Sequence, residues 1–287
     1  MKLNKDKKIL IVGLGLIGGS YAMALTKKGY RVGAITRSES SIEYALSMGL
    51  IDYGTTEIDK DIIGEADLII FCLYPNVFYE WIKNNQQYFK PGAVITDVTG
   101  IKVNIVYKIQ EILRPDVEFI PSHPMAGREV YGVKNADDRI FKGANFIVTP
   151  TSKNTPDAIE LCRNLGEELG FYRISELTPE KHDDMIGFLS QLTHCIAITL
   201  MTCNNVEHLQ DYTGDSFRDL TRIARINEDM WTELFLLNRD QLLKHISQFE
   251  VELDKLKIAL NQNDEETIKD IMRKSTERRA LFDKKEN

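Results

Sequence analysis

The chain has 287 residues, of which 43% are hydrophobic and 28% are charged, and its formal net charge is −7. This composition is typical of a globular protein with one large or two medium domains. The negative charge argues against a general nucleic-acid surface, whereas a pocket for a small anionic substrate needs only a few local cations.

Cysteine usage and apolar run lengths bear on the cellular compartment. The four cysteines show no C-x-x-C spacing, so we interpret them as free thiols and assign no metal ligands. No apolar segment reaches about 18 residues, so we expect no transmembrane helix. Residues 1–8 are polar and lead directly into the first strand, without a signal peptide. We therefore expect a reducing, cytoplasmic location, with no membrane and no nucleic-acid partner.

The first informative stretch is a strand, a glycine-rich loop and a helix over residues 8–28. An apolar run at residues 9–12 precedes the pattern G-x-G-x-x-G, and a helix is expected over residues 20–28. This combination is the dinucleotide-binding fingerprint, in which backbone N–H groups at the helix N-terminus face a pyrophosphate. The cofactor contacts predicted from this loop are Gly13, Gly15, Leu16, Ile17 and Gly18.

The end of the second strand bears on the choice of cofactor. In an NAD site an acidic residue at this point binds the ribose 2′-hydroxyl, but residues 35–38 read I-T-R-S. Arg37, followed by Ser38, instead favours the 2′-phosphate of NADP. Glu39 lies close enough to serve NAD, so the alternatives are NAD or NADP, with a preference for NADP.

Strands and helices then alternate along the chain. We expect strands over residues 30–36, 66–73, 93–98 and 117–121, with helices over residues 40–48, 76–89 and about 101–113. Such alternation predicts a parallel, doubly wound α/β sheet that binds ligands at the carboxyl ends of its strands. The loop beginning at Ser122 should join the same edge of the sheet. Four further cofactor contacts are predicted there: Leu73, Tyr74, Thr99 and Gly100.

The loop S-H-P-M-A-G-R-E at residues 122–129 carries the main catalytic candidate. His123 follows a strand at the cofactor end of the sheet, where an imidazole is suited to accept the proton of a substrate hydroxyl beside the nicotinamide.

Beyond residue 178 the pattern becomes helical. A strand at residues 145–149, a helix at 155–169 and a last strand at 171–174 come first, and no strand is expected from 180 to 281. Thr178 and Pro179 suit an N-cap and a first helical turn. The apolar run at residues 185–201 predicts a helix buried in the core or against a second subunit.

Two pairs of polar side chains in this helical part are spaced to share a helix face. Gln191 and His194 lie three residues apart, as do Asp219 and Arg222. The second spacing allows Asp219 to orient the Arg222 guanidinium while it holds a carboxylate.

These motifs, taken together, resemble the prephenate/arogenate dehydrogenase family. The resemblance rests on the glycine-rich loop, T-D-V at residues 96–98, H-P-M-A-G-R-E at 123–129, L-S-Q-L-T-H at 189–194, and F-R-D-L-T-R-I-A at 217–224 followed by M-W at 230–231. The motifs follow one another in family order and cover nearly the whole chain.

The resemblance implies oxidative decarboxylation of prephenate to 4-hydroxyphenylpyruvate, with hydride transfer to NAD(P)+. His123 then corresponds to the family histidine that contacts the ring hydroxyl. It also implies a Rossmann-type domain at residues 1–176 and an all-α substrate and dimerisation domain at 177–287 that forms a homodimer. The substrate-binding residues it implies are His194, Arg222 with Asp219, Glu129 and Trp231.

Three positions depart from the family pattern. Gly100 stands where the family often has Ser, and Thr99 is a candidate to replace that hydroxyl. Gln191 stands where His is frequent, and an amide hydrogen-bonds without titrating near neutral pH. Arg128 replaces a small polar residue, and we hypothesise that it contacts a substrate carboxylate.

Several alternatives remain open from the sequence. Arogenate in place of prephenate is one, and a β-hydroxyacid or imine reductase with the same domain order is another. A non-catalytic dinucleotide sensor would bind NAD(P) without turnover.

Overall fold

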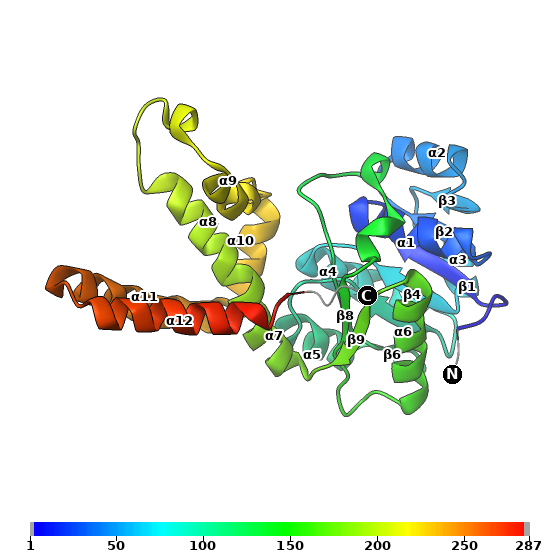
Figure 1. Cartoon of the computed structure of the whole chain (residues 1–287). Helices are drawn as coiled ribbons and strands as arrows, with labels where there is room; N and C mark the ends of the chain where they lie inside the picture. Colours follow the sequence, from blue (N-terminus) through cyan, green and yellow to red (C-terminus); the bar gives the residue numbers. More distant parts are fainter. Residues whose placement is uncertain (1–2, 284–287) are drawn as a thin grey trace. The chain divides into compact units, whose positions relative to one another are not determined.

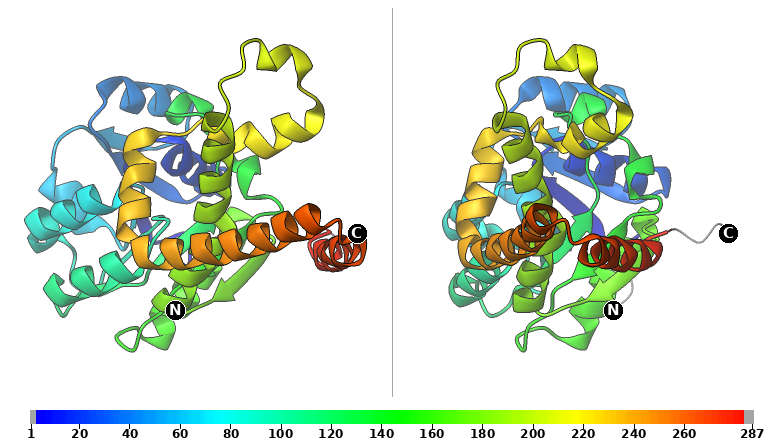
Figure 2. Two further views of the ribbon diagram at one scale, coloured as in Figure 1. Left: turned by 90° about the vertical axis from the view of Figure 1, so that its left-hand side faces the viewer. Right: turned by 60° about the vertical axis from the view of Figure 1, so that its left-hand side comes forward.

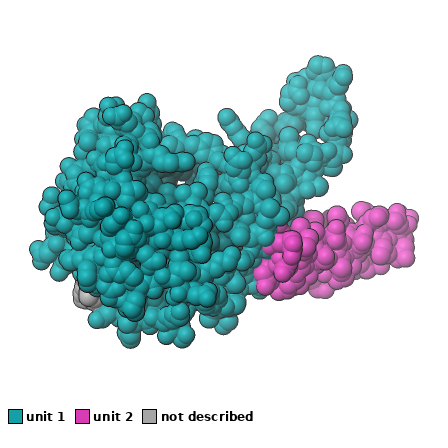
Figure 3. Space-filling view, turned by 180° about the vertical axis from the view of Figure 1, so that it is seen from behind, with its two compact units in different colours: residues 1–238 teal, residues 239–287 magenta. Residues whose placement is uncertain are grey.

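The computed structural model describes residues 3–283 of the chain. It consists of two compact units, one ending at Asn238 and one beginning at Arg239, which Figure 3 colours separately. The catalytic and binding candidates named above all lie in the first unit.

A six-stranded parallel sheet forms the centre of the first unit (Figure 1). Its strand order is β3-β2-β1-β4-β5-β6, and every neighbouring pair is parallel. This order is that of a dinucleotide-binding fold. Strands are added toward one edge from β1 to β3 and toward the other edge from β4 onward, so the order reverses between β1 and β4. The strands are β1 (Lys8–Val12), β2 (Arg31–Ile35), β3 (Tyr53–Thr55), β4 (Leu68–Phe71), β5 (Val94–Asp97) and β6 (Glu118–Phe119).

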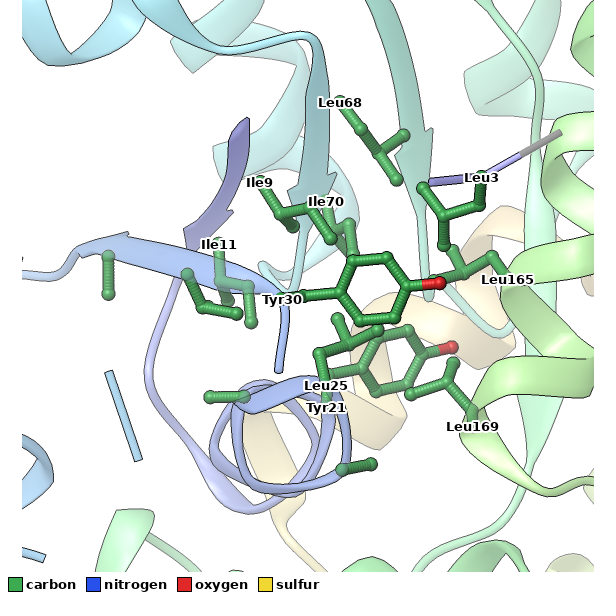
Figure 4. Close-up of a cluster of buried hydrophobic side chains, with 14 of the residues drawn as sticks. Leu3, Ile9, Ile11, Tyr21, Leu25, Tyr30, Leu68, Ile70, Leu165 and Leu169 are labelled. Atoms are coloured by element: carbon green, nitrogen blue, oxygen red, sulfur yellow. The ribbon is translucent and has the colours of Figure 1, made fainter. Parts of the chain in front are cut away.

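Helices cover both faces of this sheet, as the alternating pattern predicts. Ile9 and Ile11 of β1 pack into one core and Leu10 and Val12 into the other, because successive side chains of a strand point to opposite faces. Figure 4 shows the first core, where Tyr21 and Leu25 of the first helix lie among side chains from β1, β4 and a later helix. The first core contains α1 (Leu16–Lys27), α2 (Glu39–Ser47) and α6 (Pro156–Leu169), and the second contains α3 (Lys60–Glu65), α4 (Pro75–Asn85) and α5 (Val103–Ile112), with a 3₁₀ turn at Gln86–Tyr88.

Two short elements of this layer, β3 and α3, were not predicted from the sequence. The strand β3 has three residues, all half-buried, and so presents neither an apolar run nor a clear alternation. Asp59 caps α3 by accepting hydrogen bonds from two backbone N–H groups, but six residues are too few for a helical period to show.

A second, three-stranded sheet follows the parallel one and corrects the expectation of a loop at residue 122. Its order is β7-β8-β9, with β7 antiparallel to β8 and His123 opposite Ile147. Pro124 obscures the strand in the sequence, and its place on the edge strand β7 is one that proline tolerates. The strands are β7 (Ser122–Met125), β8 (Asn145–Val148) and β9 (Arg173–Glu176), with 3₁₀ turns at Val133–Asn135 and Asp138–Phe141.

After β9 the described residues, up to 283, contain no strand, as predicted. Thr178 is the N-cap of the first helix and accepts a hydrogen bond from the Lys181 N–H at 3.3 Å. The elements are α7 (Pro179–Ile186), a π-helical stretch (Gly187–Leu192), α8 (Thr193–Thr202), 3₁₀ turns at Leu209–Tyr212 and Arg222–Ala224, α9 (Asp215–Thr221) and α10 (Glu228–Leu237). In both views of Figure 2, α8 and α10 lie side by side.

The continuous helix Pro179–Thr202 bears on the expectation that the chain has no transmembrane helix. By length and composition alone, its 24 residues are long and apolar enough to cross a membrane. Polar residues interrupt the apolar ones along this helix, so no uninterrupted apolar run marks it in the sequence. Burial within the core, the first of the two expected settings, does not occur within one chain: Phe188 is 50% and Leu189 is 48% exposed.

The second unit is a pair of helices, α11 (Arg239–Gln262) and α12 (Glu265–Ala280). Asn263 reverses the chain with a φ of 53°, and Asp264 caps α12 by accepting the Thr267 N–H at 3.0 Å. The helical pattern predicted beyond residue 178 is confirmed in this segment. The predicted domain boundary after residue 176 stays a prediction.

Candidate active site

The glycine-rich loop has the geometry that a dinucleotide pyrophosphate requires. Gly13 has a φ of +103°, and a Cβ at Gly18 would lie 2.0 Å from the Gly13 carbonyl oxygen, so neither position accepts a side chain. A Cβ at Gly15 would meet nothing within 4 Å, which leaves the backbone accessible to a ligand. No side chain of the described residues caps α1, so its first N–H groups, from Leu16 and Ile17 onward, are available to a phosphate. These residues fit NAD(P).

Arg37 and Ser38 come directly after β2. This strand pairs with β1, which leads into the glycine-rich loop. The Arg37 side chain is exposed. The Ser38 hydroxyl caps α2 by accepting the Ser41 N–H at 3.2 Å, so it is already engaged. Among residues 3–283, no hydrogen bond or ion pair engages the Arg37 side chain, so it is available to a phosphate.

The ends of β4 and β5 supply the remaining predicted cofactor contacts. Leu73 is half-buried, and Tyr74 is 42% exposed with its hydroxyl 3.3 Å from the Asn227 side-chain amide. Thr99 is buried, and its hydroxyl contacts the Asp97 carboxylate and the Ile101 carbonyl. Thr99 is therefore not placed to replace the serine expected at position 100.

His123 belongs to a buried chain of three side chains. Its Nδ1 lies 2.9 Å from Nε2 of His182, and Nδ1 of His182 lies 2.7 Å from Oδ1 of Asp183. Asp183 also accepts the backbone N–H groups of Lys102 and Val103, each at 2.8 Å, at the start of α5. The other ring nitrogen of His123, Nε2, lies 3.8 Å from the position of a Cβ on Gly100, so that atom faces the loop after β5.

A buried ion pair lies next to the His123–His182–Asp183 hydrogen-bond chain. Lys102 and Asp97 are both fully buried, with Nζ 2.7 Å from Oδ2. Lys102 Nζ also donates to the Ser122 carbonyl at 2.6 Å, one residue before His123. The Ser122 N–H donates to Asp97 at 3.1 Å, so the ion pair holds the start of β7 against the end of β5.

Burial and the neighbouring positive charge both disfavour the protonated forms of His123 and His182. Burial lowers the pKa of His123 well below its usual range, and the neighbouring His182 and Lys102 lower it further. Burial and Lys102 do the same to the pKa of His182. Burial raises the pKa of Asp183 to about 6, although its two backbone N–H donors and Lys102 oppose the rise.

A second cluster of polar side chains includes Arg222. Arg222 Nη1 lies 2.5 Å from Oε1 of Glu129, which is 93 residues away in the sequence. The rings of His194 and Trp231 pack at a centroid distance of 3.7 Å. Burial lowers the pKa of His194, while Glu129 raises it and Arg222 lowers it, which places His194 within the field of that ion pair.

The helix α10 connects the two clusters. Trp231 and Leu234 lie one turn apart on it, and Leu234 packs 3.7 Å from the position of a Cβ on Gly100, next to His123. Gln191 donates to the Leu234 carbonyl at 3.0 Å, so Gln191 and His194 both face α10, as their spacing predicts. Leu234 of α10 therefore lies beside the loop that His123 faces, and Trp231 of the same helix packs on His194.

Three predicted substrate contacts are placed differently from expectation. Asp219 is exposed and, within the described residues, forms no ion pair with Arg222, which pairs with Glu129 instead. Arg128 donates to the Asn135 carbonyl at 2.9 Å and lies 3.6 Å from Asp137, so the structure does not bring it to the Arg222 cluster. Gln191 is 1% exposed, and its Oε1 accepts from the Asn238 side chain at 2.8 Å, which makes it part of the packing between helices.

Two family models match consecutive parts of the chain. Residues 21–174 match the nucleotide-binding domain of prephenate dehydrogenase, and residues 178–274 match its dimerization domain. The chain belongs to the prephenate dehydrogenase family. It is accordingly an NAD(P)-dependent oxidoreductase with a Rossmann-type domain followed by a helical one.

Individual relatives agree with this assignment. A prephenate dehydrogenase of Bacillus subtilis is 30% identical over 267 residues, which cover 91% of this chain and 72% of the relative. The crystal structure of prephenate dehydrogenase from Aquifex aeolicus in complex with hydroxyphenyl propionate and NAD+ is 30% identical, with a TM-score of 0.87 over 96% of this chain and 98% of that one. Synechocystis arogenate dehydrogenase is 25% identical, with a TM-score of 0.83 over 96% of this chain and 100% of that one.

His182, Asp183 and Lys102 were not predicted from the sequence. All three are polar residues that the structure buries, His182 and Lys102 completely. The segment P-E-K-H-D-D after residue 178 suggests only a solvated first helical turn. Nothing local in the sequence distinguishes its buried charges from exposed ones.

Proposed function

We propose that the chain is a prephenate dehydrogenase, which oxidises and decarboxylates prephenate to 4-hydroxyphenylpyruvate with NAD(P)+ as the oxidant. The observation that carries this proposal is the placement of His123. Its Nε2 faces the loop after β5, at the carboxyl end of the parallel sheet, and Leu234 of α10 packs against the same loop.

The bound nicotinamide supplies the acceptor for the hydride that leaves C4 of the substrate ring. His123 Nε2 accepts the proton of the C4 hydroxyl, so that C4 becomes a carbonyl carbon. The bond from C1 to its carboxylate then breaks as CO2 leaves, and the electron pair passes through the ring to the C4 oxygen. The ring becomes aromatic, and the C4 oxygen takes a proton back from His123 to give the phenol. The role of the protein is to orient the substrate and to place charges, since the driving force lies in the substrate.

Arg222 is the proposed partner of a substrate carboxylate. Its side chain is 63% exposed and is held by Glu129, so a guanidinium with further N–H donors is presented beside His194 and Trp231. We assign Glu129 the orienting role that the sequence suggested for Asp219. His194 and Trp231 are the proposed wall of the substrate site.

Arogenate is the second candidate substrate, and the likeness to the Synechocystis arogenate dehydrogenase favours it. Arogenate carries an ammonium group where prephenate has a keto oxygen. Glu129 is the carboxylate at the site that is able to pair with that ammonium, although its bond to Arg222 competes for it. Initial rates with both substrates and both cofactors test the choice: turnover of neither substrate would refute the proposed function.

NADP is the proposed preferred cofactor, because Arg37 stands where an NAD site has an acid. We expect Arg37→Ala to raise the KM for NADP+ by at least about tenfold and to leave the KM for NAD+ unchanged, since only NADP has a 2′-phosphate. Arg31→Ala, at the opposite end of β2, is the matched control. An equal rise for both cofactors would contradict the assignment.

We propose further that the protein is a cytoplasmic homodimer that uses the exposed apolar face of Pro179–Thr202 as its interface. The support is the match of residues 178–274 to a dimerization domain. Light scattering should give about twice the 32.8 kDa mass of one chain, with the protein in the soluble cell fraction. A monomer, or recovery with the membranes, would contradict this.

A further inference from the structure

We propose that His182 and Asp183 form a positioning relay that holds the proton of His123 on Nδ1, so that Nε2 of His123 is always ready to accept a proton. This inference rests on the proposed role of His123, but the state of the relay is measurable without substrate. His182 and Asp183 do not touch the reacting atoms in this arrangement; they act through His123.

The direction of each hydrogen bond follows from the far end of the chain. The ionised Asp183 carboxylate has acceptors only, and it already accepts two backbone N–H groups from the start of α5. Nδ1 of His182, 2.7 Å away, must therefore be the donor to Asp183. In a neutral ring the other nitrogen, Nε2, is then an acceptor. His123 Nδ1, 2.9 Å from it, must donate, which leaves Nε2 of His123 without a proton.

The surroundings favour this arrangement over its reverse. In the reverse arrangement His123 carries its proton on Nε2 and accepts at Nδ1 from His182. That arrangement would require Asp183 to be protonated or His182 to be charged. Lys102, with Nζ bonded to Asp97 and to the Ser122 carbonyl, supplies a positive charge that opposes a charged His182. The N-terminus of α5, ten residues long, stabilises the negative charge on Asp183.

The relay also connects the nucleotide-binding part of the first unit to the helical part that follows β9. His123 lies on β7 of the nucleotide-binding part, whereas His182 and Asp183 lie on α7, which begins the helical part. Asp183 binds the start of α5, and its carbonyl accepts the Asn238 side-chain amide at 2.9 Å. A small displacement of α7 would therefore alter the tautomer of His123 and not only its position.

The tautomer is observable by NMR of protein labelled with ¹⁵N-histidine. The chain has five histidines, and His123→Asn assigns the signal of His123. At pH 7.5 we expect His123 to carry its proton on Nδ1 in the intact protein. In His182→Leu we expect a mixture of tautomers, because the acceptor is lost. In His182→Gln the side-chain oxygen replaces that acceptor, and the Nδ1–H form should return.

Kinetics with the same variants connect the tautomer to the rate. We expect His182→Leu to lower kcat about 10- to 100-fold with KM changed less than about threefold, and His182→Gln to recover at least about tenfold of the loss. His208→Asn is the control: His208 is exposed, lies outside the relay, and has a φ of 60° that Asn tolerates. Its kcat should not change.

The possible results separate the relay from the function it serves. An Nε2–H tautomer of His123 in the intact protein overturns the relay, as does an unchanged kcat in a folded His182→Leu variant whose His123 signal is also unchanged. An Nδ1–H tautomer that gives way to a mixture of tautomers in His182→Leu supports the relay. If that result came without turnover of prephenate or arogenate, only the proposed function would fail.

Discussion

Replacing Lys102 with Met removes the positive half of the buried ion pair beneath His123. In the intact protein the three Nζ donors of Lys102 contact Asp97 at 2.7 Å, the Ser122 carbonyl at 2.6 Å and Thr99 at 3.3 Å. Both charged side chains have no exposed surface. Lys102→Met therefore leaves a carboxylate in the interior without its counter-ion, while the volume of the side chain is nearly conserved.

The expected cost is large for a single substitution. Breaking a buried pair by removing one partner costs about 3–5 kcal/mol of unfolding free energy, because the remaining charge stays desolvated. Asp97 keeps the N–H groups of Thr99 and Ser122 as donors, so we expect the lower half of that range. Adding Asp97→Asn removes the stranded charge, and the double variant should recover about 1 kcal/mol or more.

Urea unfolding at one fixed protein concentration measures these differences, since association would otherwise change the apparent stability. Lys90→Met is the control, because Lys90 is 44% exposed and also pairs with an aspartate, Asp67, at 2.6 Å. An exposed pair contributes at most about 1 kcal/mol. The reasoning is refuted if Lys102→Met costs no more than Lys90→Met. If Lys102→Met does not fold at all, the double variant still decides, because it must be more stable than the single one.

Three further predictions concern catalysis. His123→Asn should lower kcat by about 10²- to 10⁴-fold while calorimetry shows unchanged NAD(P) affinity, and a near-normal kcat would refute its role as the base. Arg222→Lys should raise the substrate KM about tenfold or more, because a lysine lacks the planar fork that binds a carboxylate, whereas an unchanged KM would exclude that contact. The base works only when it is unprotonated, and burial, His182 and Lys102 hold the pKa of His123 well below 6.5. In a pH–rate profile kcat/KM should therefore fall only on the acid side of pH 6.5, so that an acid limb at pH 7 or above would contradict the assignment.

The nucleotide-binding half was predictable because its signals are local. The apolar run of β1, the glycine spacing and the helix that follows lie within one short stretch, and their steric demands do not depend on distant residues. The elements that escaped prediction, β3, α3 and β7, are too short to show a period or contain a proline.

The site depended on the sequence and the tertiary structure in different ways. By its own residues the sequence determined the strand–glycine–helix unit and the parallel sheet, and through family motifs it selected His123 and Arg222 as candidates. Only the tertiary structure determined their partners: His182 is 59 residues from His123, and Glu129, rather than Asp219, pairs with Arg222 across 93 residues. The physical reason is that helix periodicity fixes which side chains share a face, whereas the partner across a buried interface is chosen by how whole elements pack.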